Sequence, residues 1–127
     1  MTDTVLDASA ILAMVHREPG AEVVAEELPR AIVSAVNIAE VAARMSDDGV
    51  PDGDIQTTMS NMDMDVVAFD NALALACGNL RRLTRHVGLS LGDRACLALA
   101  YARSLPVLTA DRVWAELNIG VEVRLIR

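Results

Sequence analysis

Short apolar runs alternate along this chain with longer stretches in which apolar residues recur at helical spacing. A short apolar run bounded by turn-forming residues is typical of a buried strand, whereas apolar positions three and four residues apart indicate an amphipathic helix. The pattern predicts five strands, over residues 4–7, 31–33, 65–69, 106–109 and 121–126. It predicts helices over residues 8–17, 21–28, 54–62, 70–85, 91–104 and 112–117, and one more between Ser34 and Gly49.

Strands that are short, apolar and separated by helices favour a parallel sheet covered on both faces. The helix over residues 91–104 is almost entirely apolar after Arg94, so we expect it to be buried. Ser34 and Ser90 are expected to cap the helices that follow them. The sequence shows no repeat, linker or low-complexity stretch, and 127 residues suit one domain. We therefore predict a single α/β domain over residues 1–127.

Composition narrows the chemistry that this domain can perform. The chain has 53% hydrophobic and only 2% aromatic residues, which argues against disorder and against a platform of stacked aromatics for RNA. It contains no lysine, which excludes a P-loop, a Schiff base and the switch lysine of receiver domains. The net charge of −7 disfavours non-specific DNA binding, although acids that bind metal ions would leave the arginines free to meet phosphates.

Cysteine usage and hydropathy bear on where the protein resides. Cys77 and Cys96 stand in apolar, helix-like surroundings without CxxC spacing, so we expect buried free thiols and a reducing cytoplasm. The N-terminus has no basic signal-peptide region, and no uncharged run is long enough for a membrane span. We expect a cytoplasmic protein with no membrane partner.

Four acidic residues from distant segments stand where strands end or helices begin. They are Asp7, Glu40, Asp93 and Asp111. Ligands of open parallel sheets bind beyond the carboxyl ends of the strands, so these four carboxylates are expected to converge at that edge. Asn37 lies three residues before Glu40 and shares its helix face.

Each acid also has a purely structural explanation. Asp93 would complement the dipole of its helix, and Asp111 would serve as the N-cap of a short helix. Glu40 would be a solvated helix residue. Capping does not explain a charge placed directly after Val5 and Leu6, so Asp7 is the strongest member of the set.

Converged carboxylates repel one another, and a divalent cation removes that penalty. Ligands that are all oxygen favour Mg²⁺ or Mn²⁺ over Zn²⁺. Such an ion binds phosphate oxygens and activates water for in-line attack. The residues therefore predict metal-dependent hydrolysis of phosphodiesters.

Four sequence segments together resemble PIN-domain nucleases, and most of all the VapC ribonuclease toxins of type II toxin–antitoxin systems. The segments are Leu6-Asp7-Ala8-Ser9-Ala10, Ser34-Ala35-Val36-Asn37-Ile38-Ala39-Glu40-Val41, Gly92-Asp93-Arg94 and Leu108-Thr109-Ala110-Asp111. They occur in order over the whole chain. The resemblance implies a small three-layer α/β/α fold with a mainly parallel, roughly five-stranded sheet. It further implies a Mg²⁺- or Mn²⁺-dependent endoribonuclease, a homodimer, and an antitoxin that inserts a segment near the acidic site.

By this resemblance the four acids match the catalytic acidic quartet of the family. Asp7 and Asp93 are predicted to be direct metal ligands, with Glu40 and Asp111 acting through water or at a second ion. A further set of side chains is expected to orient carboxylates and water or to contact phosphate. The orienting residues are Ser9, Asn37 and Thr109, and the phosphate contacts are Arg94 and Arg112, for which a salt bridge is the alternative.

Three other functions compete with this interpretation. An aspartate-nucleophile phosphatase needs a second Asp two residues after the first, where this chain has Ser9, and a later lysine. A receiver-like signalling module needs the same lysine and paired acids before its first-strand Asp. A PIN-like or receiver-like fold that only binds a partner remains the non-catalytic alternative.

Overall fold

The computed structural model describes residues 2–127, and its centre is a five-stranded sheet. The strands lie in the order β3-β2-β1-β4-β5, and all four pairings are parallel. Their bounds are β1 (Thr4–Leu6), β2 (Ala31–Ser34), β3 (Asp65–Val67), β4 (Val107–Thr109) and β5 (Val123–Leu125). The predicted fold is confirmed, and the sheet is parallel throughout rather than mainly parallel.

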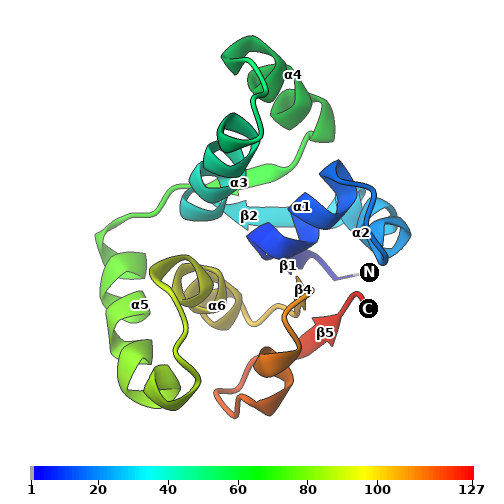
Figure 1. Cartoon of the computed structure of the whole chain (residues 1–127). Helices are drawn as coiled ribbons and strands as arrows, with labels where there is room; N and C mark the ends of the chain where they lie inside the picture. The colour runs from blue at the N-terminus through cyan, green and yellow to red at the C-terminus, as the bar shows by residue number, and fades with distance from the viewer. Residues whose placement is uncertain (1) are drawn as a thin grey trace.

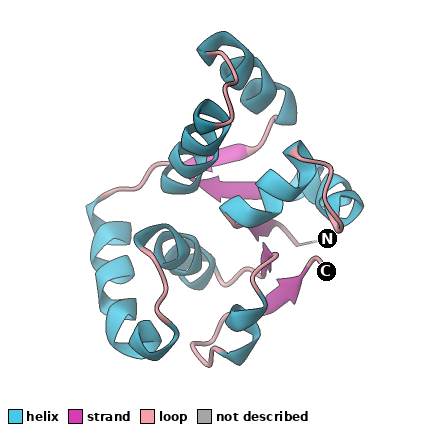
Figure 2. Cartoon of the chain, in the orientation of Figure 1, coloured by secondary structure: helices cyan, strands magenta, loops and turns pink. Residues whose placement is uncertain are grey.

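Helices cover both faces of the sheet, as Figures 1 and 2 show. They are α1 (Ala8–Val15), α2 (Ala21–Glu27), α3 (Ala35–Asp47), α4 (Asp52–Met62), α5 (Asn71–Thr84) and α6 (Leu91–Arg103). The structure also has three short 3₁₀ helices in residues 2–127, namely η1 (Leu28–Arg30), η2 (Arg85–Val87) and η3 (Arg112–Glu116). None of the helices described in residues 2–127 is long and apolar enough to cross a membrane.

Alternation along the central strand divides the core into two parts. Leu6 packs with α1, α2, α3 and α4, whereas Val5 packs with α6 and with Trp114 of η3. Neighbouring side chains of a strand point to opposite faces, so β1 contributes to both parts. Trp114 is fully buried and anchors the C-terminal segment on the α6 side. The result is a three-layer α/β/α arrangement with β1 at its centre.

The helix starts follow from the polar residues that precede them. Ser34 Oγ accepts from the Val36 N–H at 3.2 Å, and Ser90 Oγ accepts from the Asp93 N–H at 3.1 Å, so both predicted caps are confirmed. The predicted burial of α6 is also confirmed, since residues 95–100 are all buried. Cys77 and Cys96 are buried free thiols, as expected.

Several predicted bounds were wrong by a few residues. Helix α4 begins at Asp52 rather than at Asp54, because two acids in the first turn suit the positive end of the helix dipole. The C-terminal strand spans only Val123–Leu125, and the predicted short helix before it is the 3₁₀ helix η3, which ends at Glu116. These differences leave the order of elements unchanged.

Candidate active site

Asp7 stands directly after β1, at the carboxyl edge of the sheet. Its N–H donates to the Leu108 carbonyl at 3.0 Å, which continues the β1–β4 pairing to this residue. Its side chain is not used to cap α1, and the residue is only 4% exposed. A buried carboxylate without a capping role confirms that helix capping does not explain Asp7.

Two hydroxyl groups hold one oxygen of Asp7. Ser9 Oγ donates to Oδ2 at 2.6 Å and Thr109 Oγ1 donates to the same atom at 2.9 Å. The Ala110 N–H in turn donates to Ser9 Oγ, and the Asp111 N–H donates to Thr109 Oγ1. Because each hydroxyl accepts from the backbone, its single proton is directed at Asp7. The network leaves Oδ1 of Asp7 without a hydrogen bond among the described residues.

The pKa of Asp7 is raised from the ordinary 3.8 to about 6. Burial is the largest cause, and the negative charges of Asp93 and Glu40 add to it, while the hydrogen bonds from Ser9 and Thr109 oppose it. Two other carboxylates therefore face Asp7 closely enough to disfavour its ionised form.

Glu40 reaches the same edge from α3 and is held by Asn37. The Asn37 amide Nδ2 donates to Glu40 Oε1 at 2.8 Å and to the Gly92 carbonyl at 3.0 Å. The position of Asn37 on the polar face of the helix predicts an exposed side chain. It is fully buried instead, because it links α3 to the start of α6. Burial, and next the charge of Asp93, raise the pKa of Glu40.

Gly92 belongs to this site, and the sequence analysis gave it no role. A Cβ built on Gly92 would lie 2.1 Å from Glu40 Oε2 and 2.2 Å from its carboxyl carbon. The Glu40 carboxylate thus occupies the space that any side chain at position 92 would need. A glycine costs a helix about 1 kcal/mol relative to alanine, so its presence in the first turn of a buried helix was an available signal of close approach.

Asp93 stabilises the start of α6, which is the structural role that the sequence analysis gave as its alternative explanation. Its Oδ2 accepts from the Ser90 N–H at 3.0 Å, and its own N–H donates to Ser90 Oγ, which makes a capping box. Its charge nevertheless acts on both Asp7 and Glu40. Capping and facing the other acids are therefore compatible in one residue.

Asp111 also serves as a cap, at the start of η3. Its Oδ1 accepts from the Val113 N–H at 3.1 Å. Asp111 is not among the charges that raise the pKa of Asp7, and its connection to Asp7 runs through its backbone N–H and Thr109. Three of the four predicted acids are thus coupled by charge, and the fourth is their neighbour through a hydroxyl.

The two arginines predicted to contact phosphate form no ion pair within residues 2–127. Arg94 is turned toward α5, where its Nη1 donates to the Cys77 carbonyl at 3.3 Å. Arg112 is exposed at the start of η3. Their contact with phosphate stays a prediction.

The donor chemistry of this edge fits a hard divalent cation. Asp7, Glu40 and Asp93 offer only oxygen, and a cation would relieve the repulsion that raises the pKa of Asp7. Within residues 2–127, however, no three His, Cys, Asp or Glu side chains lie close enough to enclose one ion as they stand. The acids fit such an ion by their chemistry and their charge.

The family of the chain follows from a model match that covers most of its length. The model described as PIN domain matches residues 4–119. The chain therefore belongs to the PIN domain family. No curated protein matches it.

Solved structures share the whole fold. A chain of DNA-bound VapBC from Salmonella typhimurium has a TM-score of 0.77 and 17% identity over 100% of both chains. A toxin–antitoxin complex from Klebsiella pneumoniae gives 0.78 and 18% over 98% of each chain. A VapBC complex from Mycobacterium tuberculosis gives 0.59 and 24% over 100% of this chain and 99% of that one. At these identities the likeness concerns the fold.

Proposed function

We propose that this chain is a Mg²⁺- or Mn²⁺-dependent endoribonuclease that acts as the toxin of a toxin–antitoxin pair. The observation that carries the proposal is that Asp7, buried at the carboxyl edge of the sheet of a PIN-family chain, is under the charge of both Glu40 and Asp93. Three carboxylates facing one another are unfavourable for stability alone, and metal-dependent phosphodiester hydrolysis gives them a purpose.

Asp7 and Asp93 would hold the ion directly, and Glu40 and Asp111 would act through water or at a second ion. A bound Mg²⁺ or Mn²⁺ supplies a water of lowered pKa and charge neutralisation at the phosphate. Ser9 and Thr109 fix Oδ2 of Asp7, which leaves its Oδ1 available. Asn37 likewise fixes Oε1 of Glu40, so that Oε2 is the atom available to accept a proton from the attacking water.

The partners in this proposal are an RNA substrate, a cognate antitoxin and a second copy of the chain, all in the cytoplasm. The similar structures from Salmonella typhimurium and Klebsiella pneumoniae are named as VapBC and toxin–antitoxin complexes, which supports an antitoxin here. Large apolar side chains that are more than half exposed give such protein partners a surface to cover. They are Val66, Leu75, Leu91 and Tyr101.

The decisive experiment is cleavage of total RNA by the purified protein, with Mg²⁺ or with EDTA. We expect cleavage only with the metal, and a loss of several orders of magnitude in Asp7→Asn while the circular dichroism spectrum stays native. Asp63→Asn is the matched control, because Asp63 is exposed, ends α4 in the left-handed region that asparagine tolerates, and lies outside the site. Undiminished cleavage in EDTA, or by Asp7→Asn, contradicts the mechanism.

Expression in cells tests the toxin role separately. Growth should stop when the chain is produced, resume when the adjacent partner gene is expressed with it, and continue unhindered with Asp7→Asn. Light scattering of the purified protein should give the mass of a dimer. Growth arrest that the partner gene does not relieve contradicts the antitoxin part of the proposal.

The second candidate is a non-catalytic PIN module that binds only its partner. It is favoured by one observation, which is that the described acids do not enclose an ion as they stand. The same RNA assay separates the two functions, since a binding module leaves RNA intact at every metal concentration while still forming its complex.

A further inference from the structure

Charge is distributed unevenly along this acidic chain. Residues 71–104, which form α5, η2 and α6, contain five of the eleven basic residues and one of the eighteen acidic ones, Asp93. The basic residues of this segment are Arg81, Arg82, Arg85, Arg94 and Arg103. A positively charged stretch in a protein of net charge −7 is unexpected from composition alone.

The exposed arginines of this segment are not used for internal ion pairs. The ion pairs within residues 2–127 involve only basic side chains outside the segment, namely His16, Arg30, Arg44, Arg124 and Arg127. Arg81 and Arg85 are exposed, and neither donates a side-chain hydrogen bond to any described residue. Their guanidinium groups are therefore available to an external anion.

The contacts of α5 show where the first turn of α6 lies against it. The first turn of α6 meets α5 at Cys77, whose Sγ lies 3.8 Å from the Leu91 carbonyl and whose own carbonyl accepts from Arg94. Arg81 lies about one helical turn after Cys77 in α5, and Arg85, the first residue of η2, follows four residues later, so both continue along the chain from the contact with α6. Asp93 stands in that first turn. We call Arg81 and Arg85 the arginine flank.

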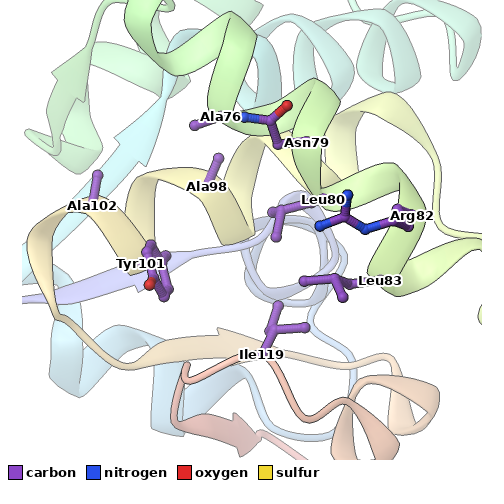
Figure 3. Close-up of a pocket in the computed structure, with 9 residues that line it drawn as sticks. All are labelled: Ala76, Asn79, Leu80, Arg82, Leu83, Ala98, Tyr101, Ala102 and Ile119. Atoms are coloured by element: carbon purple, nitrogen blue, oxygen red, sulfur yellow. The ribbon is translucent and has the colours of Figure 1, made fainter.

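The other flank of α5 has a different character. A pocket of about 300 Å³ lies between α5 and the later part of α6. Figure 3 shows Leu80, Leu83 and Tyr101 projecting into it. Its lining is mostly apolar, and Arg82 is the only charged residue in it. Helix α5 thus presents apolar side chains to the later part of α6, whereas Arg81 follows Cys77, the residue of α5 that contacts the first turn of α6.

We propose that the arginine flank binds the phosphate backbone of the RNA that the carboxylate site cuts. The inference rests on the proposed function and adds where the substrate lies. Asp7, Glu40 and Asp93 repel phosphates, so a polyanion needs cationic groups beside them to be retained. Guanidinium groups match phosphate oxygens as two-pronged donors. A second copy of the chain would bring like charges together across a two-fold axis, which disfavours it as the occupant.

Binding of a short labelled single-stranded RNA to the Asp7→Asn protein tests this, by fluorescence anisotropy over a range of KCl concentrations. The doubly substituted variant Arg81→Gln/Arg85→Gln removes both charges and keeps side chains that favour helix. We expect its affinity to fall about tenfold, and the slope of log K against log salt to decrease by about 1.4, since each contact with a single strand contributes about 0.7.

The matched control is Arg17→Gln/Arg103→Gln, which changes the net charge equally. Both residues are exposed and without an ion pair in residues 2–127; Arg17 lies beyond the far end of α1 from Asp7, and Arg103 ends α6. An equal loss of slope in both doubly substituted variants overturns the inference, because only net charge would then matter. The slope can also stay unchanged in Arg81→Gln/Arg85→Gln while RNA is still bound, and is still cut by the same variant with Asp7 intact. That result overturns the inference and leaves the proposed function standing.

Two other outcomes assign the arginine flank differently. If Arg81→Gln/Arg85→Gln binds RNA normally but loses the antitoxin or changes mass in light scattering, the flank binds protein and the inference is wrong. If the protein neither binds nor cuts RNA at any salt concentration, the proposed function fails together with it.

Discussion

The two sides of the acidic site are held in different ways. On the strand side, Asp7 is almost fully buried and its Oδ2 is fixed by the hydroxyls of Ser9 and Thr109. On the helix side, Glu40 and Asp93 stand in the early turns of α3 and α6 and are only partly buried. One side relies on short hydrogen bonds within a closed network, and the other on the close approach of two helix ends.

The acids on the two sides differ in how they affect the stability of the fold. Asp93 contributes to the fold through its capping box, so its charge is stabilised where it stands. Asp7 receives no such support from capping, and burial raises its pKa. Asp7 therefore weakens the fold at neutral pH, whereas Asp93 strengthens it through its cap; under the proposed function both acids would bind the ion.

The largest expected effect is the dependence of the protein's stability on the protonation of Asp7, on the strand side of the site. The pKa of Asp7 is about 6 in the fold against 3.8 ordinarily, so protonated Asp7 favours the folded state. That contribution is fully present below about pH 4 and is lost as the pH rises through about 6, and it amounts to about 3 kcal/mol. Urea unfolding in EDTA should show the stability of the wild type falling by this amount relative to Asp7→Asn between about pH 4 and pH 8.

Asp7→Asn is the reference for the wild type in this measurement. The contributions of all other titrating groups cancel in the difference between the two unfolding free energies. A difference between the two proteins that stays constant over that pH range would mean that Asp7 titrates normally in the fold. The contrast between the two sides of the site would then disappear.

The next effect concerns the close approach on the helix side. In Gly92→Ala the new Cβ would meet the Glu40 carboxylate, which is the end of a flexible side chain and can move away without unfolding the protein. We expect RNA cleavage to fall about tenfold, corresponding to about 1.4 kcal/mol of transition-state stabilisation. Steady-state cleavage rates and circular dichroism together separate this from loss of the fold.

Gly78→Ala is the matched control, since Gly78 is also in a helix and a Cβ there would contact nothing within 4 Å. It should retain full activity and gain about 0.5–1 kcal/mol of stability from helix propensity. If Gly92→Ala cleaves RNA as well as Gly78→Ala does, the position of Glu40 against α6 is not required.

The smallest effect separates the two tasks of Asp93. Asp93→Ala should lose about 1 kcal/mol of stability through the capping box with or without metal, whereas Asp93→Asn keeps an acceptor for the Ser90 N–H. Millimolar Mg²⁺ should raise the melting midpoint of the wild type and hardly that of either variant. Equal Mg²⁺ shifts in the three proteins would show that Asp93 is a cap and not a ligand.

Much of the fold could be predicted from the sequence because its signals are local. The apolar run before Asp7 and the serines before α3 and α6 each act within a few residues, and the structure has these elements in the predicted order. The start of α4 was misplaced because the residues after Pro51 are polar or glycine and carry no apolar periodicity before Ile55. The extent of the last strand depends on its pairing with β4, which no local pattern encodes.

The site could be predicted in its acids but not in its supports. Asn37 is polar and shares a helix face with Glu40, so periodicity places it at the surface. It is buried because its second partner, the Gly92 carbonyl, comes from 55 residues further along the chain. Gly92 in the first turn of a helix signals a close approach, but the sequence does not identify the neighbour, because the side chain that fills this space belongs to α3.

The central position of β1 has a consequence for the order in which the protein is made. This strand is the first to be synthesised, yet one of its edges is filled by β4, and the hydroxyl that fixes Asp7 lies 102 residues later. Contacts so distant along the chain form only after the segment between them is available. A nascent chain that has not yet released residues 107–109 from the ribosome therefore carries Asp7 without its network, and the acidic site is completed only after β4 has emerged.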